Sequence, residues 1–336
     1  MSQSFDIAVI GATGTVGETL VQILEERDFP IGNLHLLASS ESAGSSVMFR
    51  SKNVRVREVD EFDFSKVQLA FFAAGPAVTL SFAPRATAAG CALIDLSGAL
   101  PAEQAPQIVP EANPHLLANL SRPVQVSSPS PSATVLAVAL APLRQCLDIQ
   151  RVSLTASLAV SAQGRVAVTE LARQTAELLN ARPLEPTFFD RQMAFNLLAQ
   201  VGSPDAQGHT PLEKRLVSEL RQVLEQPLLK ISATCIQAPV FFGDSFSVTV
   251  ESAGPVDLAK VNAALEAVPG IELVEVGDYP TPVGDAVGQD VVYIGRVRGG
   301  IDDPSELNMW LTSDNVRKGA ALNAVQVAEL LIKDLL

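Results

Sequence analysis

The stretch SSPSPS, residues 127–132, holds hydroxyl groups at a point where many enzymes carry a nucleophile. An apolar strand-like run precedes it and an apolar helix-like run follows, as in the strand-to-helix turns that present a catalytic side chain. A serine nucleophile needs an adjacent base, and Asp244 would have to serve without an intervening imidazole. This requirement argues against Ser130 and Ser132 as nucleophiles.

The stretch GATGTVG, residues 11–17, has a glycine spacing that suits the phosphates of a dinucleotide. It follows the strand-like run FDIAVI and opens a run whose apolar residues recur with a helical period. In a Rossmann turn the first glycine permits the bend, the second admits a pyrophosphate and the third lets the helix pack closely. The predicted phosphate-binding residues are Gly11, Thr13, Gly14, Thr15, Val16 and Gly17. A glycine-rich turn that binds no ligand is the alternative.

A second strand ends near residue 39, where a Rossmann fold distinguishes NAD from NADP. The sequence there is ASSESAGSS, so Glu41 is the nearest charge. A carboxylate accepts from a ribose 2′-hydroxyl and repels a 2′-phosphate, which favours NAD if either nucleotide binds. A third strand, residues 67–75, ends in small residues that leave room for a cofactor. The further candidate cofactor-binding residues are Ser39, Glu41, Ser42, Ala74 and Gly75.

The elements around these motifs indicate a two-domain α/β protein of 336 residues. Strands alternate with helices in the first half, which predicts a Rossmann-type doubly wound parallel sheet. A net charge of −13 argues against nucleic acid or an anionic membrane as a partner. Three histidines and three widely spaced cysteines, without a CxxC pair, predict no metal site and fit a reducing environment. No signal peptide or membrane span is evident, so we expect a cytoplasmic location.

After about residue 150 the pattern changes to long β-rich runs with polar–apolar alternation. This predicts an α+β domain built on a large, mostly antiparallel sheet, with helices between its strands. One broad sheet face invites burial against a second copy, which predicts a homodimer. The alternative is a sheet covered entirely by its own helices. Residues 315–336 predict one long amphipathic helix that returns to the first domain.

The order of several motifs along nearly the whole chain resembles the aspartate-semialdehyde dehydrogenase family. The stretches that carry the resemblance are GATGTVG, FFAAG, IDLSGAL, AVSAQG, APVFFGDS, PTPVGDAVGQDVVYIGRVR and SDNVRKGAALNAVQVAE. The family converts β-aspartyl phosphate to β-aspartyl semialdehyde with NADPH through a cysteine thioester. The resemblance implies a Rossmann domain over residues 1–130 and 317–336, and a catalytic and dimerisation domain over 131–316. It also implies that Asn315 lies near the nicotinamide amide.

The positions that carry the family's chemistry are altered. The family's Asn-Pro-Asn-Cys-Ser falls on residues 128–132, which places Pro131 at the nucleophile. Its Gly-His-Ser falls on residues 243–245, which places Asp244 at the general base, and its active-site glutamine becomes Leu158. Proline has no side-chain nucleophile, and thioester chemistry depends on an activated thiolate. The resemblance therefore implies that no catalytic group is intact.

The family's substrate-binding positions are altered as well. They fall on Pro101, Gln237 and Arg215 in place of arginine, arginine and lysine. Only Arg215 keeps a cation, and a forked guanidinium is not equivalent to a lysine. Cys235 is the remaining candidate for a relocated nucleophile, but its match in the family is a structural strand residue, and a free cysteine commonly belongs to the core. In the cofactor site, Pro76 replaces a glycine and removes a backbone N–H.

Two functions of different classes follow from this pattern. The first is a dimeric, catalytically degenerate member of the family that serves as a non-catalytic or regulatory protein, with a nucleotide, another small molecule or nothing as ligand. The second is an NAD(P)-dependent oxidoreductase that acts on an aldehyde or related small substrate of the aspartate-family amino-acid pathway by direct hydride transfer, with Asp244 as base. A heterodimer with an active family member is a further alternative.

Overall fold

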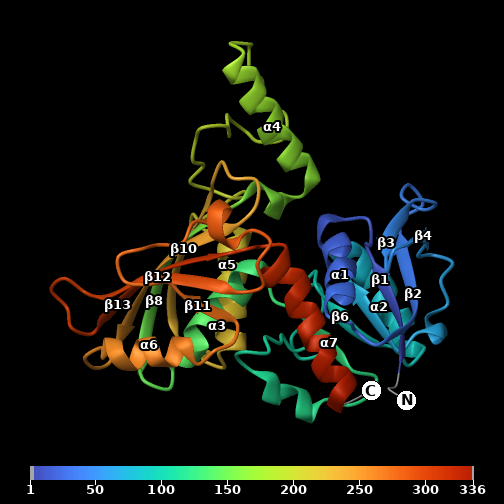
Figure 1. Ribbon diagram of the computed structural model, residues 1–336, viewed down its shortest axis with the longest axis horizontal. Coiled ribbons are helices and arrows are strands. Elements are labelled where there is room, and N and C mark those ends of the chain that lie inside the picture. The colour runs from blue at the N-terminus through green and yellow to red at the C-terminus, as the bar shows by residue number, and fades with distance from the viewer. Residues whose placement is uncertain (1–3, 335–336) are drawn as a thin grey trace. The chain divides into compact units, whose positions relative to one another are not determined.

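The computed structural model describes residues 4–334, which form two compact units (Figure 1). One unit runs to Ser130 and resumes at Ala320, and the other is Pro131–Gly319. Residues 1–3 and 335–336, the ends of the expected Rossmann domain, lie outside the described part of the chain.

The first unit contains a seven-stranded sheet in the order β3-β4-β2-β1-β5-β6-β7. Its strands are β1 (Phe5–Ile10), β2 (Ile31–Ala38), β3 (Ser46–Phe49), β4 (Lys52–Glu58), β5 (Leu69–Phe72), β6 (Ala92–Asp95) and β7 (Gln125–Ser127). All neighbours pair in parallel except β3 and β4, so the predicted Rossmann-type sheet is confirmed. The β3–β4 hairpin at one edge was not predicted. Its two-residue turn, Arg50-Ser51, has positive φ at both positions but lacks the Asn-Gly signature of such turns.

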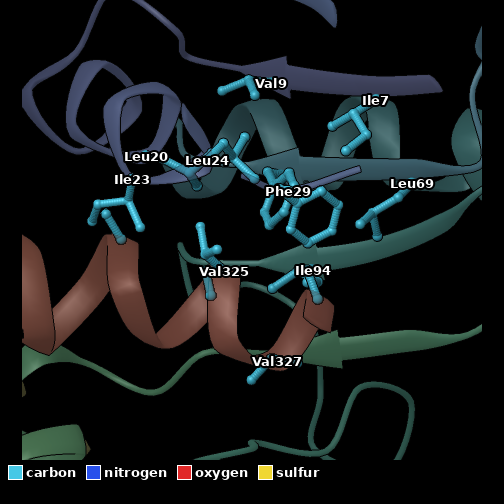
Figure 2. Close-up of a cluster of buried hydrophobic side chains, with 14 of the residues drawn as sticks. Ile7, Val9, Leu20, Ile23, Leu24, Phe29, Leu69, Ile94, Val325 and Val327 are labelled. Carbon is cyan, nitrogen blue, oxygen red and sulfur yellow. The ribbon is translucent and has the colours of Figure 1, made fainter. Parts of the chain in front are cut away.

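Helices cover both faces of this sheet because alternate residues of a strand point to opposite faces. In β1, Ile7 and Val9 belong to a core shared with α1 (Thr15–Glu26) and α7 (Asn323–Asp334). Ala8 and Ile10 belong to a second core, shared with α2 (Pro76–Ala88). Figure 2 shows Val325 of α7 pointing toward the first of these cores. The C-terminal helix therefore belongs to the first unit.

The C-terminal segment is not one regular helix. A π-helical turn at Arg317–Leu322 precedes α7, and the Gly319 amide donates to the Asp314 carbonyl oxygen five residues back at 3.0 Å. The Asp314 carboxylate accepts from the amides of Val316 and Arg317, both at 2.9 Å. These bonds fix the start of the segment, so the helix begins later than its apolar periodicity indicated.

The second unit contains a six-stranded sheet in the order β11-β12-β13-β10-β8-β9. Its strands are β8 (Ile149–Leu158), β9 (Lys230–Gln237), β10 (Asp244–Ser252), β11 (Ile271–Leu273), β12 (Val292–Gly299) and β13 (Glu306–Ser313). The central pairings are antiparallel and only the outermost pairing at each edge is parallel, so the predicted, mostly antiparallel sheet is confirmed.

Helices α3, α5 and α6 pack with this sheet, whereas α4 stands apart from it (Figure 1). The helices are α3 (Pro131–Leu143), α4 (Arg165–Leu179), α5 (Pro211–Val223) and α6 (Leu258–Glu266). Short helical turns are η1 (Phe64–Lys66), η2 (Pro114–Asn119), η3 (Val160–Gln163) and η4 (Pro282–Ala286). In β10, Phe246, Val248 and Val250 are buried, whereas Ser247 and Glu251 are exposed. One face of the sheet is therefore apolar and covered, and the other is polar.

Candidate functional site

The predicted site residues fall into two groups, one in each unit. The group in the first unit surrounds the glycine-rich turn between β1 and α1, and the group in the second unit includes the ends of β8 and β9 and the start of β10.

Close packing within the turn requires two of its three glycines. Gly11 has φ +84°, and a Cβ there would lie 2.7 Å from the carbonyl oxygen of Ala73. A Cβ on Gly17 would lie 2.1 Å from the carbonyl oxygen of Gly11. Gly14 is exposed, and the nearest contact of an added Cβ would be 3.4 Å, so the fold itself does not demand a glycine there. An open backbone at Gly14 is what close approach of a phosphate requires.

A hollow of about 470 Å³ lies beside this turn at the carboxyl edge of the sheet. Its lining residues are Ile10, Gly11, Thr13, Ala38, Ser39, Ser40, Ser42, Val59, Asp60, Ala74, Val78, Ser81 and Phe82. Helices α1 and α2 begin at the same edge, with Gly14 and Gly75 as their N-cap residues, and Pro76 is the first residue of α2. Helix N-termini favour anions, because their first N–H groups lack partners within the helix.

Only part of the predicted nucleotide group lines this hollow. Gly11, Thr13, Ser39, Ser42 and Ala74 do so. Thr15, Val16 and Gly17 belong to the first turn of α1, and Glu41 is exposed in the turn after β2. Among the described residues, the acidic residue that lines the hollow is Asp60 rather than Glu41. The sequence analysis missed Asp60 because it follows β4, a strand that was not predicted.

A buried carboxylate shapes the loop that leads to Pro101. Asp95, at the end of β6, accepts from the Ser97 amide at 2.8 Å and the Ser97 hydroxyl at 2.6 Å. It also accepts from the amides of Ala99 and Leu100 at 2.9 and 3.1 Å. These hydrogen bonds to the buried Asp95 carboxylate fix the conformation of the loop. Pro101 is exposed at the end of the loop. Asp95 belongs to the stretch IDLSGAL, and the sequence of that stretch alone does not reveal these hydrogen bonds.

In the second unit, Pro131 is the first residue of α3. Proline suits this position because its missing N–H would have no partner within the helix, and its φ is preset for a helix. It offers no group that could attack a carbonyl carbon. A Cβ on Gly319 would lie 2.8 Å from the Pro131 Cβ, so the two residues are packed directly together.

Asp244 opens strand β10 and is 2% exposed. Its Oδ1 accepts from the Ala159 amide at 2.9 Å. Burial raises the pKa of Asp244 to about 7; the Ala159 hydrogen bond opposes this shift, and the nearby charge of Asp314 adds to it. The carboxyl group therefore exchanges its proton near neutral pH, which general acid–base chemistry requires.

Gln237, at the end of β9, directs its amide into the protein rather than toward a ligand. Its Nε2 donates to the Leu158 carbonyl oxygen at 2.7 Å, and its Oε1 accepts from Gln163 Nε2. Gln237 and Leu158 are 1% and 2% exposed. On α5, Arg215 forms an ion pair with the buried Glu219 at 2.7 Å. Gln237 and Leu158 are both uncharged, so neither offers a positive charge that could bind a substrate carboxylate.

Asn315 links the start of β10 to the segment after β8. Its Nδ2 donates to the Ser161 hydroxyl at 3.0 Å, and its Oδ1 accepts from the Gly243 amide at 3.1 Å. Gly243 precedes Asp244 in the chain. The second unit therefore brings Leu158, Gln237, Asp244 and Asn315 into one connected region, whereas Arg215 is engaged on α5.

Cys235 lies in the core of the second unit with no exposed surface. Burial raises its pKa to about 12, and the charges of Glu213 and Asp244 act in the same direction. Its backbone amide donates to Glu213 Oε1 at 3.0 Å. At neutral pH the group is a thiol, and a thiol is a poor nucleophile. Cys235 has the environment of a packed core residue.

Between residues 4 and 334, no group of three or more His, Cys, Asp or Glu side chains is placed to hold a metal ion. Within the same range, no helix is both long enough and apolar enough to cross a bilayer.

Two family models match the chain. The NAD binding domain of semialdehyde dehydrogenase matches residues 6–120, and the dimerisation domain of semialdehyde dehydrogenase matches residues 140–318. The USG-1 protein homolog of Azotobacter vinelandii is 61% identical over 333 residues, which cover 99% of each chain. Aspartate-semialdehyde dehydrogenase 2 of Vibrio cholerae is 42% identical over 335 residues, again 99% of each chain. The structure of a probable aspartate-semialdehyde dehydrogenase from Pseudomonas aeruginosa is 57% identical and superposes with a TM-score of 0.97, covering 99% of this chain and 100% of that one.

Proposed function

The chain belongs to the semialdehyde dehydrogenase family, and we propose that it is a dimeric, nucleotide-binding member that has lost the phosphorylating semialdehyde dehydrogenase reaction. Its role is then non-catalytic or regulatory, in the cytoplasm. The observation that carries the proposal is Pro131 at the helix start where the family has its cysteine. Without a thiolate at this position, the thioester intermediate of the family cannot form there.

The other polar roles of the reaction are altered in the same unit, which supports the proposal. Asp244 replaces the general base, and Gln237, whose amide is engaged with Leu158 and Gln163, replaces a substrate-binding arginine. Catalytic groups that act as a unit lose most of their effect when one member is removed. Without the nucleophile, the base and an arginine, the protein cannot carry out the reaction through a thioester intermediate, even slowly.

The dimeric state and the cofactor are parts of the same proposal. The match to the dimerisation domain and the exposed polar residues on one face of β10 favour a homodimer. The NAD binding domain and the open backbone at Gly14 favour retention of a nucleotide. Glu41 favours NAD over NADP, because a carboxylate near the ribose would repel a 2′-phosphate.

A steady-state assay tests the loss of activity. Purified protein is incubated with β-aspartyl semialdehyde, phosphate and NADP or NAD, next to an active aspartate-semialdehyde dehydrogenase. We expect a rate at least about 10⁴-fold lower than that of the active enzyme, since removal of a nucleophile alone has effects of this size. Pro131→Cys should remain near background, because the base and the arginine are still missing. Turnover by the purified wild-type protein would refute the proposal.

A second function is favoured by one observation, the buried Asp244 whose pKa lies near neutrality. An NAD(P)-dependent oxidoreductase that transfers hydride directly to or from a small aldehyde or related substrate needs a proton acceptor but no nucleophile. A screen of aldehydes and hydroxy acids with NAD and NADP distinguishes the two functions. Turnover that Asp244→Asn abolishes would support the oxidoreductase.

A further inference from the structure

The hollow in the first unit is built from strand ends that are neighbours in the sheet. Its lining includes residues from the ends of β1 and β2 and from just after β4, which are adjacent in the sheet order. Neighbouring strands lie about 4.8 Å apart, so Asp60 lies about 10 Å across the sheet edge from the glycine-rich turn. In a Rossmann fold the first strand end meets the pyrophosphate and the second meets the ribose. The end of β4 is therefore the place for the base.

Several of the residues that line the hollow are apolar. Val59 after β4 and Val78 and Phe82 on α2 are all lining residues, and Val59 and Phe82 are buried. The Val59 amide donates to the Ala38 carbonyl oxygen at 3.0 Å, which ties the end of β4 to the end of β2. Apolar surfaces of this kind suit a flat aromatic base, and few polar groups then decide which base is accepted.

The backbone of Asp60 is held in place by Arg85. The Arg85 guanidinium donates to the carbonyl oxygens of Asp60 and Phe62 at 3.0 and 3.1 Å. It also lies 5.2 Å from the centre of the Phe82 ring and 5.9 Å from that of Phe64. Arg85 is engaged with these backbone oxygens, and Asp60, an exposed residue, is the acidic member of the described residues that line the hollow.

We propose that the Asp60 carboxylate accepts a hydrogen bond from the exocyclic 6-amino group of adenine, so that the hollow selects adenine nucleotides. Hypoxanthine carries an oxygen at the same position, and two acceptors would then face each other. The inference rests on the proposed retention of a nucleotide and adds the residue that recognises its base. Glu41 keeps its separate role as the candidate reader of the ribose.

The test compares NAD with nicotinamide hypoxanthine dinucleotide, in which a carbonyl oxygen replaces the 6-amino group and the neighbouring N1 carries a hydrogen. Calorimetric titration of the full-length protein should give a Kd on the order of tenfold lower for NAD, the effect of one hydrogen bond to a charged group. Asp60→Ala should bring the two Kd values within about twofold of each other by weakening NAD binding. Glu61→Ala removes the same charge from the adjacent, exposed residue, which does not line the hollow, and should preserve the preference.

The outcomes separate this inference from the function on which it rests. Equal Kd values for the two dinucleotides in the wild-type protein would overturn the role of Asp60 while nucleotide binding stands. A preference that survives Asp60→Ala would overturn it as well, because another group would then read the base. Binding of neither dinucleotide would overturn both the inference and the proposed retention of a nucleotide. Unchanged thermal unfolding of both variants shows that the substitutions leave the fold intact.

Discussion

Asp244 is a buried, titrating residue at a position that the family resemblance assigns to the general base. The family has a histidine base here, whereas this chain buries a carboxyl group that accepts from the Ala159 amide. Burial raises the pKa of Asp244 to about 7, against about 3.9 for an unperturbed aspartate. The folded protein therefore binds this proton more tightly than the unfolded chain does.

This difference predicts a pH dependence of stability. The neutral carboxyl group carries no penalty below about pH 4, and the folded state loses stability as the pH rises from about 4 to about 7. Asp244→Asn cannot ionise, so the variant should gain a few kcal/mol relative to wild type across this window and keep a constant difference above it. Urea unfolding of both proteins from pH 4.5 to 8 measures the effect. A difference that does not change with pH would show that Asp244 is not buried as described.

The consequence of Pro131 could be predicted from the sequence, whereas the surroundings of Gln237 and Asp60 could not. Pro131 cannot be a nucleophile in any conformation, so its consequence followed from the sequence alone. The inward direction of the Gln237 amide depends on Gln163 and on the Leu158 carbonyl oxygen, which are distant in sequence. Asp60 lines the hollow only because β4 pairs with β2. Such contacts have no local signal in the sequence.

At the scale of elements, Pro131 and Gly319 join the start of α3 to the π-helical turn before α7. A Cβ on Gly319 would lie 2.8 Å from the Pro131 Cβ and 3.1 Å from its Cα. Replacing glycine by alanine within a helix ordinarily stabilises a protein. Here the added methyl group would meet backbone atoms that cannot move independently of α3.

Gly319→Ala should therefore destabilise the protein by about 1–3 kcal/mol, the usual effect of overpacking. Gly254→Ala is a matched control, because an added Cβ there would meet no atom within 4 Å. The control should change the free energy of unfolding by less than about 0.5 kcal/mol. Thermal or urea unfolding of the two variants measures both values, and equal stability of the two would contradict the packing of Gly319 against Pro131.

The elements with strong periodicity were predictable, and those fixed by turns or tertiary contacts were not. Polar and apolar residues alternate in β10, and apolar residues recur with a helical period in α1. Each pattern indicates directly which face of the element is buried. The β3–β4 hairpin turns at Arg50-Ser51, a pair with no preference for positive φ, so nothing marked it. The helix at the C-terminus was expected from residue 315, but Asp314 and the close contact at Gly319 impose a π-helical start.

For the whole molecule, two family models match the chain, and the proposed function is that the fold is kept while the groups that perform the family's reaction are lost. The apolar cores on both faces of the first sheet and the covered face of the second are complete in the described residues. Stability depends on such cores rather than on catalytic side chains, so a chain can keep its fold after its activity is lost. What is kept includes the hollow beside the glycine-rich turn and the match to the dimerisation domain.

The most direct test of the loss of the nucleophile is the intact mass of the protein after incubation with β-aspartyl semialdehyde and NADP in the absence of phosphate. Under these conditions an active family member run in parallel should accumulate its acyl-enzyme. We predict that the mass of this chain stays that of the unmodified protein, because Pro131 cannot be acylated and the Cys235 thiol is buried with its pKa raised to about 12. An acyl adduct that peptide mapping assigns to Cys235, Ser130 or Ser132 would contradict this prediction and show that the nucleophile has moved rather than been lost.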